Sequence, residues 1–328
     1  MKIFIYCRHF APSIGGMEKL LEILAGEFVR KGHEVTVATE TPGEVGLPYP
    51  VHRAPGFAEL VRLARASDVV VTAPISLRRL PALVLGGRPI VAAHPDRHVG
   101  RSTRLKDLVA RFVTNIVPSR YMARHFPRPI VIENLFDARA FRWPEGQDKR
   151  DGIVFLGRLV EHKGCSILIR AFACIAESYP DTRLTIAGEG AQRGDLEALV
   201  RDLGAGDRIS FTGPVTGPAL THLLQTSRIM VVPTVAAEPF GIVALEGLAS
   251  GCRMVISRSG GLPEAVGDLA IFFESGDVES CAAALGRALD ESSPPDRESV
   301  ERHLAQFQPD RIADRYLEVL ANLVASPR

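Results

Sequence analysis

Short apolar runs alternate with amphipathic segments along the chain, and this alternation constrains the fold more than any other feature. Residues 2–7 (KIFIYC) predict a buried strand, apolar residues at helical spacing follow Gly16, and residues 34–39 (EVTVAT) predict the next strand. A strand, a helix and a second strand in this order favour a parallel sheet with right-handed crossovers. The first part of the chain is therefore predicted to form a doubly wound α/β domain.

A second series of the same kind begins at Gly152, after residues 133–148 have lost periodicity and gathered proline, glycine and charge. We interpret the intervening stretch as a linker, because 328 residues suffice for two α/β domains with full cores. The expected domains cover residues 1–140 and 141–308, and a break at residues 292–295 precedes a closing helix. The strands expected in the second series are 153–156, 184–187, 209–211, 229–232, 254–256 and 270–273.

Composition is that of a globular protein without a bilayer-spanning segment. Hydrophobic residues make up 46% and charged residues 23% of the chain, and no apolar run approaches the roughly 20 residues that cross a bilayer. The start, MKIFIYCRHF, is typical of a strand rather than of a signal peptide. Five cysteines are scattered without metal-like spacing, so we expect a reduced, cytoplasmic protein without a metal site.

Charge is divided unevenly along the chain. Residues 1–140 hold 20 Lys and Arg against 12 Asp and Glu, whereas residues 141–328 hold 19 against 26. A helix predicted over residues 101–113 has an apolar face and a basic face, formed by Leu105, Leu108, Val109 and Phe112 and by Arg101, Arg104 and Arg111. These features suit peripheral contact with the inner face of an anionic membrane, but the pattern of the helix itself fits somewhat better with a helix packed on the sheet with its cations in water. Aromatic content of 6% argues against nucleic-acid binding.

The stretch from Val232 to Glu264 combines a strand end, a helix start and two carboxylates. A loop with Glu238 and Gly241 leads into a helix-like segment that carries Glu246. Helix starts favour anions because their first N–H groups lack internal partners, and Gly241 would let a ligand approach the backbone. Carboxylates accept hydrogen bonds from sugar hydroxyls, so both glutamates are candidates for binding a polyhydroxyl ring. Spacing alone also allows a solvated loop glutamate and a surface helix glutamate.

Cations follow the first strand of the second series, in the string GRLVEHKG. Arg158 comes directly after Gly157, and Lys163 stands just before a helix. An arginine fork and a mobile lysine together suit the oxygens of a diphosphate at the carboxyl edge of a sheet, where open α/β folds bind ligands. These residues alone also allow two solvated loop cations.

Gly188, Glu189 and Gly190 follow a strand and precede a helix, so they imitate a dinucleotide-binding fingerprint. The next glycine is one residue late, and the following strand ends in Gly213 and Pro214 instead of an acidic residue for a ribose. We therefore expect no nicotinamide cofactor, but a tight turn that lets a nucleotide approach the backbone.

The strings GRLVEHKG, EPFGIVALE and GGLPE together resemble retaining glycosyltransferase family 4, the glycosyl transferases group 1. The resemblance covers nearly the whole chain and is strongest from Gly157 to Pro263. It implies a GT-B fold, in which two Rossmann-like domains with parallel sheets face each other across a cleft and a closing helix at residues 309–328 packs on the first domain. It also implies retaining, metal-independent transfer of a hexose-type sugar from a UDP- or GDP-sugar to a hydroxyl acceptor, in glycolipid, polysaccharide or glycoconjugate biosynthesis, with no further cofactor.

The resemblance also assigns roles to residues. Arg158 and Lys163 would stabilise the diphosphate leaving group, Glu238 would bind hydroxyls of the transferred sugar, and Glu246 would bind those of the ribose. His94 would lie beside the transferred sugar, although a lone histidine after a strand is more often a cap or packing residue. His94, Arg158, Lys163 and Glu238 are thus the expected catalytic residues. Further donor contacts are expected from Gly15, Gly16, Gly157, Gly188, Glu189, Gly213, Pro214, Val215, Phe240, Gly241, Ile242 and Val243.

Three other functions remain as alternatives. An NAD-dependent oxidoreductase or a non-hydrolysing sugar-nucleotide epimerase would also be built from Rossmann-like units, but neither explains GRLVEHKG and EPFGIVALE together. A catalytically silent partner of another transferase would keep the nucleotide-sugar site without turnover. The sequence contains neither the nucleophile elbow of a Ser-His-Asp hydrolase nor an Asp-x-Asp pair for a divalent ion.

Overall fold

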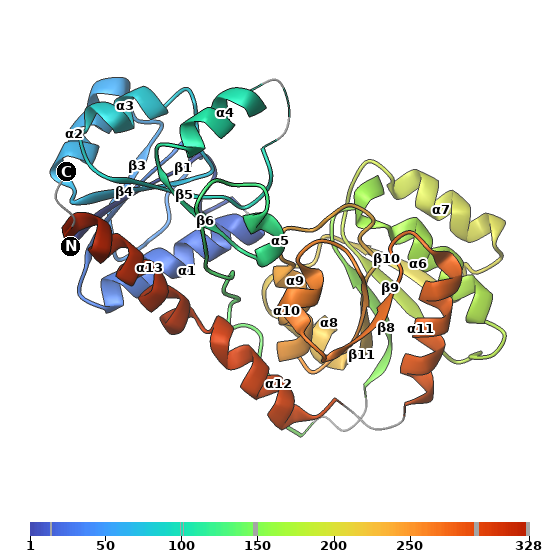
Figure 1. Cartoon of the computed structure of the whole chain (residues 1–328). Coiled ribbons are helices and arrows are strands. Elements are labelled where there is room, and N and C mark those ends of the chain that lie inside the picture. The colour runs from blue at the N-terminus through green and yellow to red at the C-terminus, as the bar shows by residue number, and fades with distance from the viewer. Residues whose placement is uncertain (14, 99, 101, 147–149, 292–294, 326–328) are drawn as a thin grey trace. The chain divides into compact units, whose positions relative to one another are not determined.

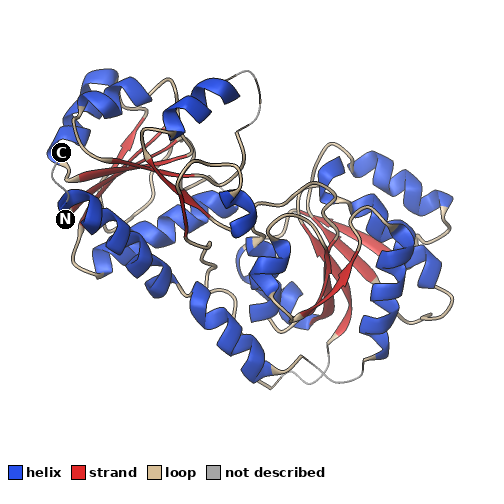
Figure 2. Cartoon of the chain, in the orientation of Figure 1, coloured by secondary structure: helices blue, strands red, loops and turns tan. Residues whose placement is uncertain are grey.

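The computed structural model describes residues 1–13, 15–98, 100, 102–146, 150–291 and 295–325. The chain divides into two compact units (Figure 1), which are unit 1 (Met1–Asp137 with Gln306–Arg328) and unit 2 (Ala138–Ala305). The domains expected from the sequence end at residues 140 and 308. Each unit is built around a parallel sheet with helices on both faces (Figure 2), which confirms the predicted α/β class.

Unit 1 contains a seven-stranded parallel sheet in the order β3-β2-β1-β4-β5-β6-β7. Its central strands are continuous apolar runs because helices cover both faces of the sheet. The strands are β1 (Lys2–Cys7), β2 (Glu34–Thr39), β3 (Val51–Arg53), β4 (Val69–Ala73), β5 (Ile90–Ala93), β6 (Thr114–Val117) and β7 (Pro129–Val131). The helices are α1 (Gly16–Arg30), α2 (Phe57–Ala66), α3 (Leu80–Leu85), α4 (Thr103–Ala110), α5 (Arg120–Ala123) and α13 (Pro309–Ala325).

The helices of unit 1 form two layers. α1 and α13 pack against each other on one face of the sheet, and α2, α3 and α4 lie on the other, as right-handed crossovers require (Figure 1). Phe28 of α1 and Tyr316 of α13 have ring centroids 6.4 Å apart, and Arg315 of α13 forms an ion pair with Glu133. The last described helix therefore belongs to the fold of unit 1.

Unit 2 contains a six-stranded parallel sheet in the order β10-β9-β8-β11-β12-β13. The strands are β8 (Asp151–Leu156), β9 (Leu184–Ala187), β10 (Ile209–Gly213), β11 (Ser227–Val232), β12 (Arg253–Ser257) and β13 (Ala270–Phe273). The α-helices are α6 (Cys165–Ile175), α7 (Arg193–Asp202), α8 (Gly217–Thr226), α9 (Ile242–Ala249), α10 (Leu262–Val266), α11 (Val278–Asp290) and α12 (Arg297–Leu304). Two short 3₁₀ helices are η1 (Glu161–Lys163) and η2 (Ala305–Phe307).

β3, α11 (Val278–Asp290) and α12 were not predicted from the sequence. β3 (Val51–Arg53) was not predicted, because three half-buried residues at the edge of a sheet make no apolar run. α12 was not predicted, because it is mostly polar and buries only Val300 and Leu304. The break expected at residues 292–295 lies, apart from Pro295, outside the described residues, and so does Arg101.

The cysteines are free thiols, and most lie in the cores. Cys7, Cys165, Cys252 and Cys281 are buried, whereas Cys174 is exposed. Burial raises the pKa of the Cys165 thiol to about 12, so this group stays protonated at neutral pH. None of the described helices has both the length and the apolar character needed to cross a bilayer.

Backbone hydrogen bonds join neighbouring loops at the carboxyl edge of the unit 2 sheet. Each bond runs from one loop to the loop of an adjacent strand, so the loops after β10, β9, β8, β11 and β12 form one continuous surface. The four bonds are Gly188 N to Gly213 O (2.8 Å), Leu159 N to Glu189 O (2.9 Å), Val235 N to His162 O (2.9 Å) and Gly261 N to Glu238 O (2.7 Å).

Glycines make this close contact between loops sterically feasible. A Cβ at Gly164 would lie 1.9 Å from the carbonyl oxygen of Pro233, and a Cβ at Gly188 would lie 1.8 Å from that of Gly157. The sequence predicted a turn at Gly188 that a nucleotide could approach. The structure gives a different reason for this glycine, since the neighbouring loop already occupies the space beside it.

We expect Gly164→Ala to destabilise the protein much more than Gly204→Ala. Both glycines have positive φ angles, 70° and 64°, so both substitutions carry a left-handed strain of about 1 kcal/mol. The new Cβ meets nothing within 4 Å at Gly204, but it meets the Pro233 carbonyl at Gly164. The free energy of unfolding in urea should fall by about 2 kcal/mol more for Gly164→Ala. Equal losses would show that the loop contact is not tight.

Candidate functional site

The predicted donor residues of the second half lie on the joined loops of unit 2. Open parallel sheets bind ligands at this edge, because the loops that follow the strands converge there. In sheet order, they are Gly213 at the end of β10 with Pro214 and Val215 after it; Gly188 and Glu189 after β9; Gly157, Arg158 and Lys163 after β8; and Glu238, Phe240 and Gly241 after β11, followed by Ile242, Val243 and Glu246 on α9. The other three predicted residues, Gly15, Gly16 and His94, belong to unit 1.

Lys163 and Glu238 form an ion pair between two of these loops. Lys163 ends η1, and its Nζ donates to Oε2 of Glu238 at 2.7 Å. The side chains are 22% and 20% exposed, so water screens this pair less than a pair on the open surface. The sequence predicted separate roles for the two residues, a diphosphate ligand and a sugar ligand. The structure brings them into direct contact, so a bound anion would share or compete for the charge of Lys163.

Arg158 supplies a second cation at the same edge. It follows Gly157 directly after β8, and its side chain is exposed. Within the part of the chain that the structure describes, its guanidinium has no hydrogen-bond or ion-pair partner. An unpaired guanidinium can form two parallel hydrogen bonds to phosphate oxygens without first giving up a protein partner.

α6 and α9 are among the helices that begin at this edge without a side-chain cap. α6 starts after Gly164 and α9 starts after Gly241, and neither N-cap residue supplies a side-chain hydrogen bond. Helix N-termini carry partial positive charge, which adds to that of the neighbouring cations. Glu246 is half-buried in the second turn of α9.

The fold itself requires a glycine at position 241, apart from any access that it gives to a ligand. Its φ angle is 103°, and a Cβ there would lie 2.4 Å from Cδ2 of Leu262 at the start of α10. The sequence predicted that Gly241 lets a ligand approach the backbone. The structure shows that the turn into α9 requires glycine even when no ligand is considered.

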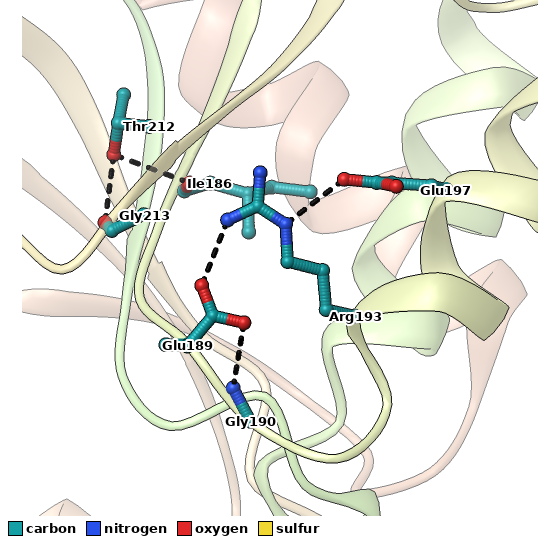
Figure 3. Close-up of polar contacts among 7 residues, drawn as sticks. All are labelled: Ile186, Glu189, Gly190, Arg193, Glu197, Thr212 and Gly213. Atoms are coloured by element: carbon teal, nitrogen blue, oxygen red, sulfur yellow. Dashed lines mark hydrogen bonds and ion pairs between the residues drawn. The ribbon is translucent and has the colours of Figure 1, made fainter.

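Arg193 holds the carboxylate of Glu189 in place (Figure 3). Its Nη1 donates to Oε2 of Glu189 at 2.9 Å, and its Nε donates to Oε1 of Glu197 at 2.9 Å. The N–H of Gly190 also donates to Glu189 Oε1 at 3.4 Å. A Cβ at Gly213 would lie 3.6 Å from Nη1 of Arg193. The arginine therefore lies beside the turn that was predicted to contact the donor.

Sequence reasoning missed Arg193, although a signal was present. Glu189, Arg193 and Glu197 are spaced four residues apart, which places opposite charges next to one another on a helical surface. The fingerprint-like glycines predict only the turn itself, whereas the charge pattern around it indicates the contacts of Arg193.

In unit 1, a carboxylate lies at the predicted glycine loop. Gly15 is the N-cap of α1 and makes no side-chain cap. Oε2 of Glu18 lies 2.2 Å from the position that a Cβ on Gly15 would occupy. Glu18 thus places negative charge at the helix start where the sequence predicted donor phosphate, and a phosphate there would require Glu18 to turn away.

His94 is a buried, neutral side chain with one free acceptor. It follows β5 and is 2% exposed, and its Nε2 donates to Oδ1 of Asn115 at 2.9 Å. Asn115 Nδ2 donates to the carbonyl oxygen of Ala110 at 2.7 Å, so the oxygen of the same amide must be the acceptor from His94. The Nδ1 lone pair of His94 has no partner among the described residues.

Burial also sets the charge of His94. Desolvation lowers its pKa from 6.5 to about 4, and its ring packs 4.0 Å from that of Phe126. At neutral pH the ring is therefore an uncharged acceptor, which suits a hydrogen bond from a hydroxyl group.

We expect His94→Gln to flatten the pH dependence of stability between pH 4 and pH 6.5. In this window the unfolded chain binds a proton at His94 that the folded chain does not, so the stability of the native sequence falls as the pH is lowered. The full effect is about 3 kcal/mol in the free energy of unfolding. Urea denaturation at several pH values measures it, with His222→Gln at an exposed position as the control. A slope unchanged by His94→Gln would contradict the burial argument.

Comparison with known proteins adds evidence from sequence. Residues 137–303, about half of the chain, match the family model of glycosyl transferases group 1. A GDP-mannose-dependent alpha-(1-6)-phosphatidylinositol monomannoside mannosyltransferase of Mycolicibacterium smegmatis is 29% identical over 337 residues, which cover 85% of this chain and 87% of that protein. An uncharacterized glycosyltransferase of Methanocaldococcus jannaschii is 43% identical over 120 residues, which cover 37% of this chain and only 30% of that protein.

Solved structures show the same fold. Anabaena HepE in complex with UDP and glucose has a TM-score of 0.83 at 20% identity, covering 98% of this chain and all of that chain. WaaG, a glycosyltransferase involved in lipopolysaccharide biosynthesis, has a TM-score of 0.70 at 16% identity, covering 98% and 100%. These similarities confirm the predicted GT-B fold. Together with the match over residues 137–303, they establish that the chain belongs to the family of glycosyl transferases group 1.

Proposed function

We propose that this chain is a retaining, metal-independent glycosyltransferase that moves a hexose-type sugar from a UDP- or GDP-sugar to a hydroxyl acceptor. The observation that carries the proposal is the Lys163–Glu238 pair beside Arg158 and the start of α9, at the ligand-binding edge of one sheet. The names of relatives support both nucleotides, since one uses GDP-mannose and another was crystallised with UDP and glucose. The proposal places the chain in glycolipid, polysaccharide or glycoconjugate biosynthesis and needs no cofactor besides the donor.

Positive groups of unit 2 would bind the donor diphosphate. Arg158 is exposed and unpaired among the described residues, Lys163 would share its charge between Glu238 and the diphosphate, and the first turn of α9 adds partial positive charge. Negative charge grows on the leaving phosphate as its bond to the sugar breaks. Fixed cations at that place therefore stabilise the transition state more than the ground state.

The two glutamates would bind hydroxyl groups. Lys163 contacts Oε2 of Glu238, and Oε1, which has no hydrogen-bond partner among the described residues, would accept from a hydroxyl of the transferred sugar. Glu246, on α9, would accept from the ribose hydroxyls. The backbone of Gly213, Pro214 and Val215 would contact the base, while Arg193 keeps Glu189 in place beside it.

Retention would follow from attack on the same face that the leaving group departs from. The acceptor oxygen forms a bond to the anomeric carbon as the bond from that carbon to the diphosphate oxygen breaks. The diphosphate takes the proton of the acceptor hydroxyl, so the step needs no nucleophile from the protein. His94, Gly15 and Gly16 remain expected donor contacts from unit 1, with His94 as a neutral acceptor for a sugar hydroxyl.

We expect Arg158→Ala to lower the kcat/KM of donor turnover by about 100-fold, because it removes a charge that acts on the leaving group. Transfer and donor hydrolysis should be measured with UDP- and GDP-sugars, with circular dichroism as a check of folding. Arg170→Ala, at an exposed position of α6, is the matched control and should keep full activity. Full turnover in Arg158→Ala would refute the site. Donor binding without any turnover in the native chain would support a catalytically silent partner instead.

Glu238→Gln should separate sugar binding from diphosphate binding. The change removes the charge that competes for Lys163, so we expect UDP or GDP alone to bind about fivefold tighter. Turnover of the sugar donor should fall, because a neutral amide accepts less strongly from the sugar hydroxyls. Calorimetric titration with UDP and GDP measures the first effect, and Glu274→Gln at an exposed position serves as the control. Weaker binding of UDP and GDP to Glu238→Gln would argue against competition for Lys163.

A further inference from the structure

The loop after β9 carries a carboxylate that faces solvent at the edge of the candidate site. Glu189 lies between Gly188 and Gly190 in this loop, and its side chain is 51% exposed. A Cβ at Gly190 would lie 2.3 Å from the carbonyl oxygen of Leu159, so the turn packs tightly on the neighbouring loop. The backbone that carries the carboxylate is therefore held in place by its surroundings.

Arg193 fixes the side chain of Glu189 as well (Figure 3). It is the first residue of α7, and its guanidinium forms ion pairs with Glu189 and with Glu197, each at 2.9 Å. The carbon of the same guanidinium lies 5.7 Å from the centre of the Phe211 ring. Two carboxylates and an aromatic face thus hold the arginine, and the arginine holds Glu189 in one orientation.

Both partners of this pair keep unused hydrogen-bonding groups. Each oxygen of an ionised carboxylate accepts about two hydrogen bonds. In Glu189, Oε2 accepts from Nη1 of Arg193 at 2.9 Å, and Oε1 accepts only from the N–H of Gly190, at 3.4 Å. Nη2 of Arg193 has no partner among the described residues, and it points away from Glu189 (Figure 3). The pair therefore offers two acceptors next to a donor.

Guanine carries the complementary row of groups. Its N1–H and its N2 amino group donate side by side, and its O6 accepts next to them. Uracil places its single N–H between two carbonyl oxygens, so one carboxylate oxygen would face a carbonyl oxygen. Adenine has an acceptor at N1 that would face the carboxylate. A carboxylate fixed beside an arginine therefore favours guanine over both other bases.

We propose that Glu189 and Arg193 select a guanine nucleotide, so that the donor is a GDP-sugar. Glu189 would accept from N1–H and from the N2 amino group, and Arg193 would donate to O6. This selection depends on the proposed function, in which the base contacts Gly213, Pro214 and Val215. A Cβ at Gly213 would lie 3.6 Å from Nη1 of Arg193, so the pair borders the place of the base.

Calorimetric titration of the full chain with GDP, IDP and UDP tests the proposal. The three share the ribose and the diphosphate, and IDP differs from GDP only by the missing N2 amino group. We expect GDP to bind about tenfold tighter than IDP and about 50-fold tighter than UDP, because hydrogen bonds to a charged group are lost in turn.

Three results with the native chain would overturn the proposal. Equal binding of GDP and IDP would remove the contact of Glu189 to the N2 amino group. UDP binding as tight as GDP binding would refute the selection of guanine and leave the transferase proposal standing. No binding of any of the three nucleotides would count against the proposed function and overturn the selection with it.

Variants separate the selection of a base from a structural role. Glu189→Ala removes both acceptors, so GDP and IDP should bind equally, and UDP binding should not weaken. Arg193→Met removes the donor to O6 and the contact that holds Glu189, so GDP should bind about tenfold more weakly, again without a loss for UDP. Asp195→Ala, at an exposed position in the first turn of α7, is the matched control and should keep the native order of affinities.

A purely structural role of the ion pairs predicts a different result. Their loss would then weaken α7, and all three nucleotides would lose affinity by the same factor. That result, or a native preference for GDP over IDP in Glu189→Ala, would overturn the assignment of Glu189 and Arg193. Circular dichroism on each variant confirms that the compared chains are folded.

Discussion

Backbone contact between neighbouring loops is the interaction on which the candidate site of unit 2 depends. The carbonyl oxygens of Gly157, Pro233 and Glu238 each lie where the Cβ of another residue would stand. Loops packed this closely cannot shift separately, so the charged side chains that they carry keep a fixed spacing. Electrostatic stabilisation of a leaving group requires such preorganised charges. In the proposed function, the glycines would thus serve the chemistry indirectly, by letting the loops meet.

On this rigid surface, charge is balanced rather than merely positive. Lys163 forms an ion pair with Glu238, and Arg193 forms ion pairs with both Glu189 and Glu197. Arg158 has no partner among the described residues and is the cation that a diphosphate could engage without breaking an existing pair. In the proposed function, the ion pair with Lys163 holds the carboxylate of Glu238 in one orientation. This one contact would both limit the affinity for an anion and orient Glu238 toward a sugar ligand.

Sequence periodicity predicted β1 and β2 with their observed bounds, because buried parallel strands are unbroken apolar runs. It missed β3, a half-buried edge strand without such a run. Spacing and resemblance selected Lys163 and Glu238, but not their pairing, since the two lie 75 residues apart in the chain and meet only through the loop contacts. The contact of Gly188 with the Gly157 carbonyl was not predicted either, because that neighbour belongs to another strand.

The apolar stripe of α4 shows a different limit of sequence reasoning. An amphipathic helix has the same pattern whether its apolar side faces a sheet or another medium, so periodicity cannot choose between them. Here the hydrogen bonds of Asn115 determine how α4 is attached to unit 1. Its amide nitrogen holds the last turn of α4 through Ala110, and its amide oxygen accepts from His94 Nε2. One buried amide therefore fixes both the tautomer of His94 and the attachment of α4 through its last turn.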